Sequence, residues 1–272
     1  MRGKNILIIL LTVLVFLSAA VLGVSTVYRI TEVSVVVSGI SEAAKTEAEQ
    51  LRFRLMEVYD KQSSFSVKSE AAEAVLEDFP YFRMKSFEKK YPNRIVVKVS
   101  EDAEVYALPK GYGEYYIIGE DGTILSIRED PTNRSDGAEN VLLLGNPALV
   151  VTGEKGELLQ GDDFIPCLFD FCKEMSRSTA LNGIRRNVVS VEVVRLASLQ
   201  SETMLKLTMR EGVKIYVHNP LSLTREKAEL AVNKYMGLAP AERLKGMIAI
   251  WDGETALEAK YSPEDGFESA GS

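Results

Sequence analysis

The sequence contains few of the residues that build metal sites and disulfide scaffolds. Among its 272 residues there are one histidine and two cysteines, too few for a Cys/His zinc site or a disulfide-rich fold. The chain also lacks an excess of positive charge, because 39 acidic residues outnumber 32 basic ones and give a formal net charge of -7. An acidic chain has no general attraction for a phosphate backbone, so we expect no nucleic-acid partner.

Sequence motifs that carry common catalytic chemistry are also missing. The chain has no Gly-x-Ser-x-Gly elbow, no phosphate-binding loop and no Cys/His metal spacing. Its only histidine, His218, ends a predicted strand beside Asn219-Pro220, where a turn is the ordinary interpretation. Several aspartates are explained by predicted turns and helix starts: Asp121, Asp162, Asp163 and Asp252. A paired-carboxylate glycosidase stays open but unsupported, and we expect no catalytic, cofactor-binding or metal-binding residue and no small-molecule substrate.

One long apolar segment lies near the N-terminus. Residues 6–28 carry no charge, and a helix of this length exceeds the roughly 20 residues that cross a bilayer. Arg2 and Lys4 precede the segment, so the positive-inside rule predicts a single-pass cell-membrane protein with residues 1–5 in the cytoplasm and the rest outside. The alternative is a cleaved signal peptide with the small residues 18–20 at its cleavage site, although the apolar stretch is long for a signal core.

The two cysteines lie in one segment of helical periodicity. Cys167 and Cys172 are five positions apart, which on a helix separates their α-carbons by roughly 8 Å, beyond the limit of about 7 Å for a disulfide. We therefore predict that both thiols are free and that Cys172 is a small core residue.

The first exported segment, residues 30–101, has the pattern of a strand, two helices and two strands. Alternating valines indicate a half-buried strand that stops at Gly39. Apolar residues at helical spacing indicate the helices, of which the second is capped by Ser69 and stops before Pro80. Pro92-Asn93 is the turn between the last two strands. In order, the predicted elements are a strand at 33–37, helices at 44–58 and 69–79, and strands at 82–91 and 94–100.

The second segment, residues 102–261, is predicted to be a mainly antiparallel β domain with two helices. Turn pairs such as Asp121-Gly122 and Asp252-Gly253 lie between alternating apolar residues and indicate hairpins. Residues 262–272 are small, polar and acidic, and we expect a disordered tail. The predicted strands lie at 115–118, 123–127, 189–193, 205–209, 213–217, 247–251 and 256–261, with a helix around the cysteines and another at 223–238.

Several short segments together carry a resemblance to a known family. They are a strand ending in glycine (33–39), Phe-Ser-Val before a helix (65–67), Phe-Pro-Tyr after it (79–81), a Tyr-Pro-Asn-Arg turn with alternating valines and a following glutamate (91–101), an Asp-Gly hairpin (116–122), and a glycine before a buried strand (246–250). In this order, over about residues 6–261, they are similar to the bacterial cell-division protein family FtsQ/DivIB.

The resemblance implies an α+β protein without catalytic activity. It implies a membrane helix at 6–28, which contacts the lipid bilayer, then a POTRA-type (polypeptide-transport-associated) module at 30–101 and a β domain at 102–261. It also implies a role at the division septum, where the protein recruits and stabilises the small bitopic partners FtsL and FtsB/DivIC and links them to septal peptidoglycan synthesis. The alternatives are another anchored scaffold, of a sporulation or secretion-channel complex, and an extracytoplasmic hydrolase that depends on His218.

By the same resemblance, the last strand at 256–261 is the edge to which a partner strand adds. Glu254, Glu258 and Lys260 would keep this edge soluble before a partner arrives. Trp251 and Tyr261 are candidate aromatic anchors, although Trp251 is equally well explained as a core residue at a strand end. The predicted partner-binding residues are Trp251, Glu254, Ala256, Leu257, Glu258, Ala259, Lys260 and Tyr261.

Overall fold

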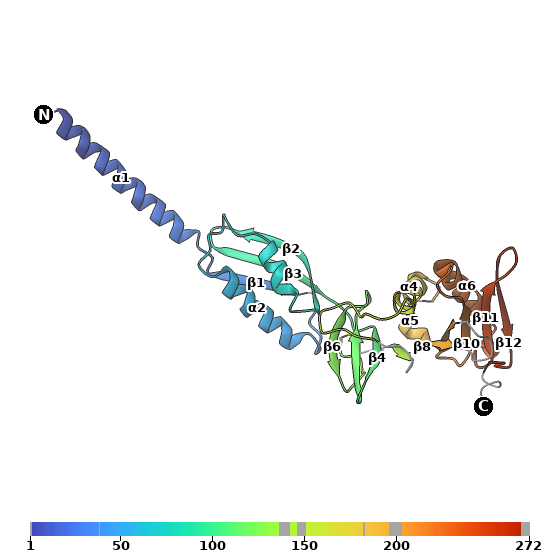
Figure 1. Ribbon diagram of the computed structural model, residues 1–272. Helices are drawn as coiled ribbons and strands as arrows, with labels where there is room; N and C mark the ends of the chain where they lie inside the picture. The colour runs from blue at the N-terminus through green and yellow to red at the C-terminus, as the bar shows by residue number, and fades with distance from the viewer. Residues whose placement is uncertain are drawn as a thin grey trace. The chain divides into compact units, whose positions relative to one another are not determined.

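The computed structural model describes residues 2–37, 39–135, 142–145, 151–181, 183–195 and 203–267. The fold is α+β, and the chain divides into two compact units, Met1–Glu101 and Asp102–Ser272. Figure 1 shows the helices and strands of each unit. The two are called unit 1 and unit 2 below.

The N-terminal segment forms a helix, α1 (Arg2–Val27). Among the described residues, no helix is both long enough and apolar enough to cross a membrane. The prediction of a membrane-spanning helix at 6–28 is therefore wrong for the described part of the chain.

The rest of unit 1 has helices packed on a small sheet, because β3 alternates buried and more exposed residues while α2 buries one face. Ile95 and Val97 of β3 and Leu51 and Leu55 of α2 are fully buried. Strand β3 lies in the middle of the sheet, parallel to β1 and antiparallel to β2. The elements are β1 (Glu32–Val37), α2 (Lys45–Tyr59), α3 (Glu70–Leu76), β2 (Phe82–Lys90) and β3 (Arg94–Glu101).

The strands described in unit 2 form one continuous sheet. Their order across it is β12-β11-β10-β9-β8-β7-β4-β5-β6. Five of the pairs are antiparallel, namely β4–β5, β5–β6, β8–β9, β9–β10 and β11–β12, whereas β4–β7, β7–β8 and β10–β11 are parallel. The strands are β4 (Tyr106–Gly111), β5 (Glu114–Ile118), β6 (Ile124–Arg128), β7 (Leu142–Gly145), β8 (Val188–Arg195), β9 (Thr203–Met209), β10 (Lys214–His218), β11 (Met247–Asp252) and β12 (Leu257–Ser262).

Two longer helices pack together in unit 2, and the core lies between them and the sheet (Figure 1). Helix α6 connects β10 to β11, and such a crossover is what allows two consecutive strands to pair in parallel. Both cysteines are free, as predicted, and Cys172 is buried as expected; Cys167 is buried too. The helices are α4 (Phe164–Arg177), α5 (Ile184–Asn187), α6 (Thr224–Met236) and α7 (Pro240–Arg243).

Candidate functional site

The predicted partner strand lies at an edge of the unit 2 sheet. Within the described part of the chain, β12 pairs with β11 on one side and with no strand on the other. The pairing is antiparallel, with Ile250 opposite Ala259 and Ile248 opposite Tyr261. Strand β12 therefore has one row of main-chain groups that another strand can pair with.

The hairpin turn determines which main-chain groups point outward. Gly253 N donates to Ala256 O over 3.0 Å, so these two residues form a hydrogen-bonded pair. Because hydrogen-bonded and non-hydrogen-bonded pairs alternate in an antiparallel ladder, Glu258 and Lys260 direct their main-chain groups toward β11. Leu257, Ala259 and Tyr261 direct theirs toward the open side.

The side chains of β12 alternate between the two faces of the sheet. Ala259 and Tyr261 are partly buried and pack against the core beneath the helices, and helix α6 packs on this strand. Glu258 and Lys260 are exposed on the opposite face. A strand added at this edge could therefore place apolar side chains beside α6 and polar ones on the other face.

The remaining predicted site residues lie on β11 and in the turn. Glu254 and Ala256 are exposed in the turn. Trp251 is half-buried on β11 opposite Glu258, whereas Tyr261 lies opposite the core residue Ile248. Because alternate residues of a strand face opposite sides, the structure does not bring Trp251 and Tyr261 together as one aromatic pair.

A buried lysine, which no sequence pattern singled out, fixes the end of β11. The side chain of Lys227 on α6 is fully buried, and its Nζ donates to His218 O at 3.0 Å and to Asn219 O at 2.8 Å. Its Nζ also lies 2.9 Å from Asp252 Oδ1, and this hydrogen-bonded contact lowers the pKa of the Asp252 carboxyl. Lys227 lies one helical turn before Ala231, so the two side chains share one face of α6. This spacing could have indicated that Lys227 points inward.

The residues after β12 cover the sheet face opposite the helices. Asp265 forms an ion pair of 3.1 Å with Lys214 and accepts a hydrogen bond of 3.1 Å from Tyr216 Oη. The Phe267 ring lies 4.7 Å from the Tyr216 ring, measured between centroids, and 5.8 Å from the His218 ring. These contacts involve the first part of the predicted tail; residues 268–272 lie outside the described residues.

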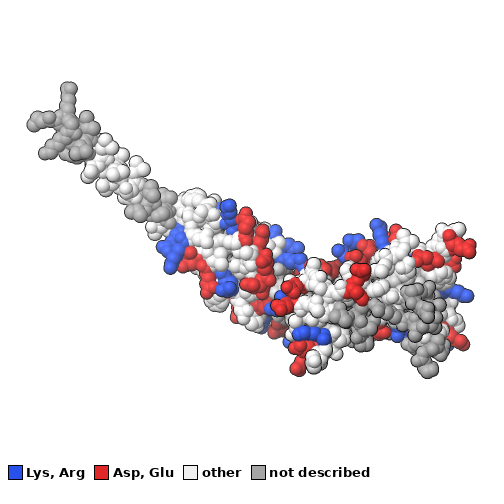
Figure 2. Space-filling view, in the orientation of Figure 1, with Lys and Arg blue, Asp and Glu red and all other residues white. Residues whose placement is uncertain are grey.

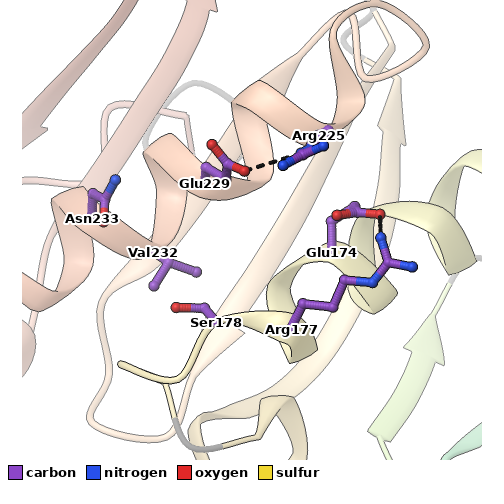
Figure 3. Close-up of a pocket in the computed structure, with 7 residues that line it drawn as sticks. All are labelled: Glu174, Arg177, Ser178, Arg225, Glu229, Val232 and Asn233. Atoms are coloured by element: carbon purple, nitrogen blue, oxygen red, sulfur yellow. Dashed lines mark hydrogen bonds and ion pairs between the residues drawn. The ribbon is translucent and has the colours of Figure 1, made fainter.

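A groove of about 430 Å³ lies between α4 and α6, and Figure 3 shows the side chains that line it. Each arginine pairs with a glutamate of its own helix, Arg177 with Glu174 and Arg225 with Glu229, the second pair at 3.1 Å. Such exposed pairs contribute little to stability. Their charges are balanced within the groove, which therefore does not favour an ionic ligand of either sign. Its lining residues are Glu174, Arg177, Ser178, Arg225, Glu229, Val232 and Asn233.

Two groups that could carry chemistry occupy structural positions. Burial raises the pKa of the Cys167 thiol to about 11 and also raises the pKa of Cys172, so both are poor nucleophiles at neutral pH. His218 contacts the Phe267 ring. Among the described residues, no group of His, Cys, Asp and Glu side chains could hold a metal ion.

Comparison with known proteins identifies no relative of this chain. The chain matches no protein-family model and no curated protein.

Proposed function

We propose that the protein is a non-enzymatic scaffold of the bacterial division machinery that binds FtsL-like and FtsB/DivIC-like partners at the septum by strand addition to β12. The observation that supports this proposal most directly is the unpaired edge of β12 at the end of the unit 2 sheet. The resemblance of the sequence to the FtsQ/DivIB family supplies the biological setting and the class of partner.

Main-chain pairing supplies the affinity in this mechanism. Leu257, Ala259 and Tyr261 offer their N–H and C=O groups to the open side, and each hydrogen bond contributes about 0.5–1.5 kcal/mol net. The half-buried side chains of Ala259 and Tyr261 extend the apolar face on which the partner's side chains would pack. Specificity then comes from every second side chain of the partner strand, because these side chains would pack beside α6.

The surroundings of the hairpin favour binding by holding the edge in place. The contact of Lys227 with Asp252 fixes the end of β11, and the contacts of Asp265 and Phe267 fix the chain after β12. Gly253 permits the close turn, because a Cβ there would lie 2.6 Å from Ala256 O. A strand that is already ordered loses less conformational entropy when a partner binds.

The proposal is tested by replacing native protein in dividing cells with Ala259→Pro. Proline removes the N–H of Ala259, which points to the open side, so the β11 pairing is retained while one partner bond is lost. We expect long undivided cells and loss of the FtsB/DivIC-like partner from pull-downs. The matched control is Lys260→Ala, which removes an exposed side chain from the same strand and should support division.

Two outcomes would reject the proposal. Normal septation in cells that lack the protein altogether would remove the division role and favour a scaffold of a sporulation or secretion-channel complex. Full partner recovery by Ala259→Pro would remove β12 as the binding edge.

A further inference from the structure

Three aromatic rings form a cluster on the surface of unit 1. The centroid of the Phe65 ring lies 4.5 Å from that of Tyr28 and 5.5 Å from that of Tyr91, and the two tyrosine rings are 6.2 Å apart. Phe65 and Tyr91 are nevertheless 58% and 57% exposed. Large aromatic side chains gathered in contact with solvent are typical of an interaction site. We call Tyr28, Phe65 and Tyr91 the aromatic platform.

Hydrogen bonds between three chain segments hold the platform in place. Ser64 N donates to Tyr28 O over 2.7 Å, and Ile30 N donates to Gln62 O over 2.8 Å. The loop after β2 joins them, because Thr31 N donates to Asn93 O over 3.0 Å. The rings are therefore presented by a connected backbone rather than by independent loops.

The same three segments, residues 28–32, 60–65 and 88–94, carry an excess of positive charge. They contain the basic residues Arg29, Lys61, Lys89, Lys90 and Arg94 and the acidic residues Glu32, Asp60 and Glu88. Five cations against three carboxylates leave a local charge of +2, in a chain whose net charge is -7. Lys61, Lys90 and Arg94 are ion-paired with Asp60, Glu88 and Glu32 respectively.

The cations without a carboxylate partner lie close to the rings. Among the described residues, Arg29 and Lys89 form no ion pair, and Lys89 Nζ donates to Phe65 O over 3.3 Å. Arg29 is exposed and follows Tyr28 directly in the chain, and the half-buried Lys89 contacts the backbone of Phe65. Both cations therefore lie beside the rings and could contact the same surface.

We propose that the aromatic platform and its basic residues bind the headgroup layer of an anionic lipid membrane. Tyrosine and phenylalanine rings settle at the boundary between headgroups and acyl chains, and nearby lysine and arginine are attracted to anionic lipids. The loops that carry Phe65 and Tyr91 present exposed rings rather than a groove, which suits a broad surface better than a peptide. This contact is peripheral, requires no spanning helix and uses none of the partner-edge residues.

A tryptophan placed in the platform tests the proposal in the full-length chain. The native protein has one tryptophan, Trp251, so Trp251→Phe with Phe65→Trp gives a single reporter at the platform. With phosphatidylglycerol vesicles we expect blue-shifted emission that brominated lipids quench. The matched control is Trp251→Phe with Phe53→Trp, because Phe53 on α2 of the same unit is 68% exposed; its emission should not change.

The charges are tested on the same reporter. Lys89→Gln should weaken vesicle binding about five-fold, since one basic residue near an anionic surface contributes roughly 1 kcal/mol. Phosphatidylcholine vesicles should leave the reporter unaffected. An unshifted reporter on anionic vesicles, or an equal response at position 53, would overturn the proposal. A response to soluble polyglutamate in place of vesicles would also overturn it and indicate an acidic protein partner.

Discussion

At the scale of single residues, the candidate site depends on the charged side chain of Lys227, which the sequence pattern alone would place on the surface. Lys227 lies in Thr-Arg-Glu-Lys at the start of α6, a pattern typical of a solvated helix turn. In the structure it is fully buried and binds two carbonyls and a carboxylate. Those acceptors come from the ends of β10 and β11, and sequence spacing on α6 alone cannot predict which strand ends lie beneath it.

Lys227→Met should lower the free energy of unfolding by about 2–3 kcal/mol, because it leaves buried carbonyls without their donor. Chemical denaturation measures the change. The control is Lys234→Met on the same helix, where the side chain is half-buried and the expected change is within about 0.5 kcal/mol. Equal effects of the two substitutions would contradict the structural role of Lys227.

The same contact makes a pH-dependent contribution to stability. The pKa of Asp252 is lowered in the folded state by its hydrogen bond from Lys227. Its contribution is therefore fully present above the pKa of the unfolded carboxyl and is lost as pH falls through the lower, folded-state pKa. Because the Asp252 side chain is 39% exposed, the effect is screened and small. Lys227→Met should accordingly flatten the acid side of the stability profile.

At the scale of elements, the hairpins could be predicted from sequence, but the neighbours of each strand could not. Period-two alternation around Asp121-Gly122 and Asp252-Gly253 correctly predicts the hairpins of β5 with β6 and of β11 with β12, because a short turn forces adjacent pairing. The turns themselves differ from the predicted Asp-Gly pairs: Gly119 N donates to Thr123 O and Gly253 N donates to Ala256 O, so the loops are 120–122 and 254–255. The parallel pairing of β10 with β11 depends on the packing of α6 and has no local signature. The predicted cap also differs, because Ser69 precedes α3 without a capping hydrogen bond.

The segment after β12 has a composition that resembles a solvated tail, and its contacts involve residues distant in sequence. Asp265 and Phe267 bind Lys214 and Tyr216, so we expect them to prevent fraying at the end of β12. The double substitution Asp265→Ala and Phe267→Ala should speed hydrogen exchange of the β12 amides about ten-fold, equivalent to roughly 1.4 kcal/mol. Glu264→Ala, at an exposed position, is the control. Unchanged exchange in the double variant would show that the segment does not support the edge.

At the scale of the whole molecule, periodicity predicts the order of elements after α1 in unit 1, whereas in unit 2 it misses β4, β7, α5 and α7. The sequence pattern yields strand, helix, helix, strand, strand for the region before Glu101, and the structure has that order. The membrane-spanning assignment relied on apolar length alone, and it is corrected by the described helices. Figure 2 shows acidic and basic side chains interspersed on the visible face of unit 2, which suits a protein that works through defined contacts.

The function itself follows from fewer observations than the fold. The edge position of β12 was predicted from the family resemblance, and among the described strands β12 is the last of the unit 2 sheet, paired only with β11. The proposed division role rests on two supports, the free edge of β12 and a family resemblance carried by short segments. It depends on binding of the FtsB/DivIC-like partner. Strand addition to β12 is its central claim.

Hydrogen exchange in a complex with the FtsB/DivIC-like partner tests that claim most directly. We expect the amides of Leu257, Ala259 and Tyr261 to become strongly protected on binding, because they then donate to the added strand. The amides of Glu258 and Lys260, already paired with β11, should change much less. Equal protection at all five positions, or protection elsewhere in unit 2 without any at these three, would contradict strand addition to β12.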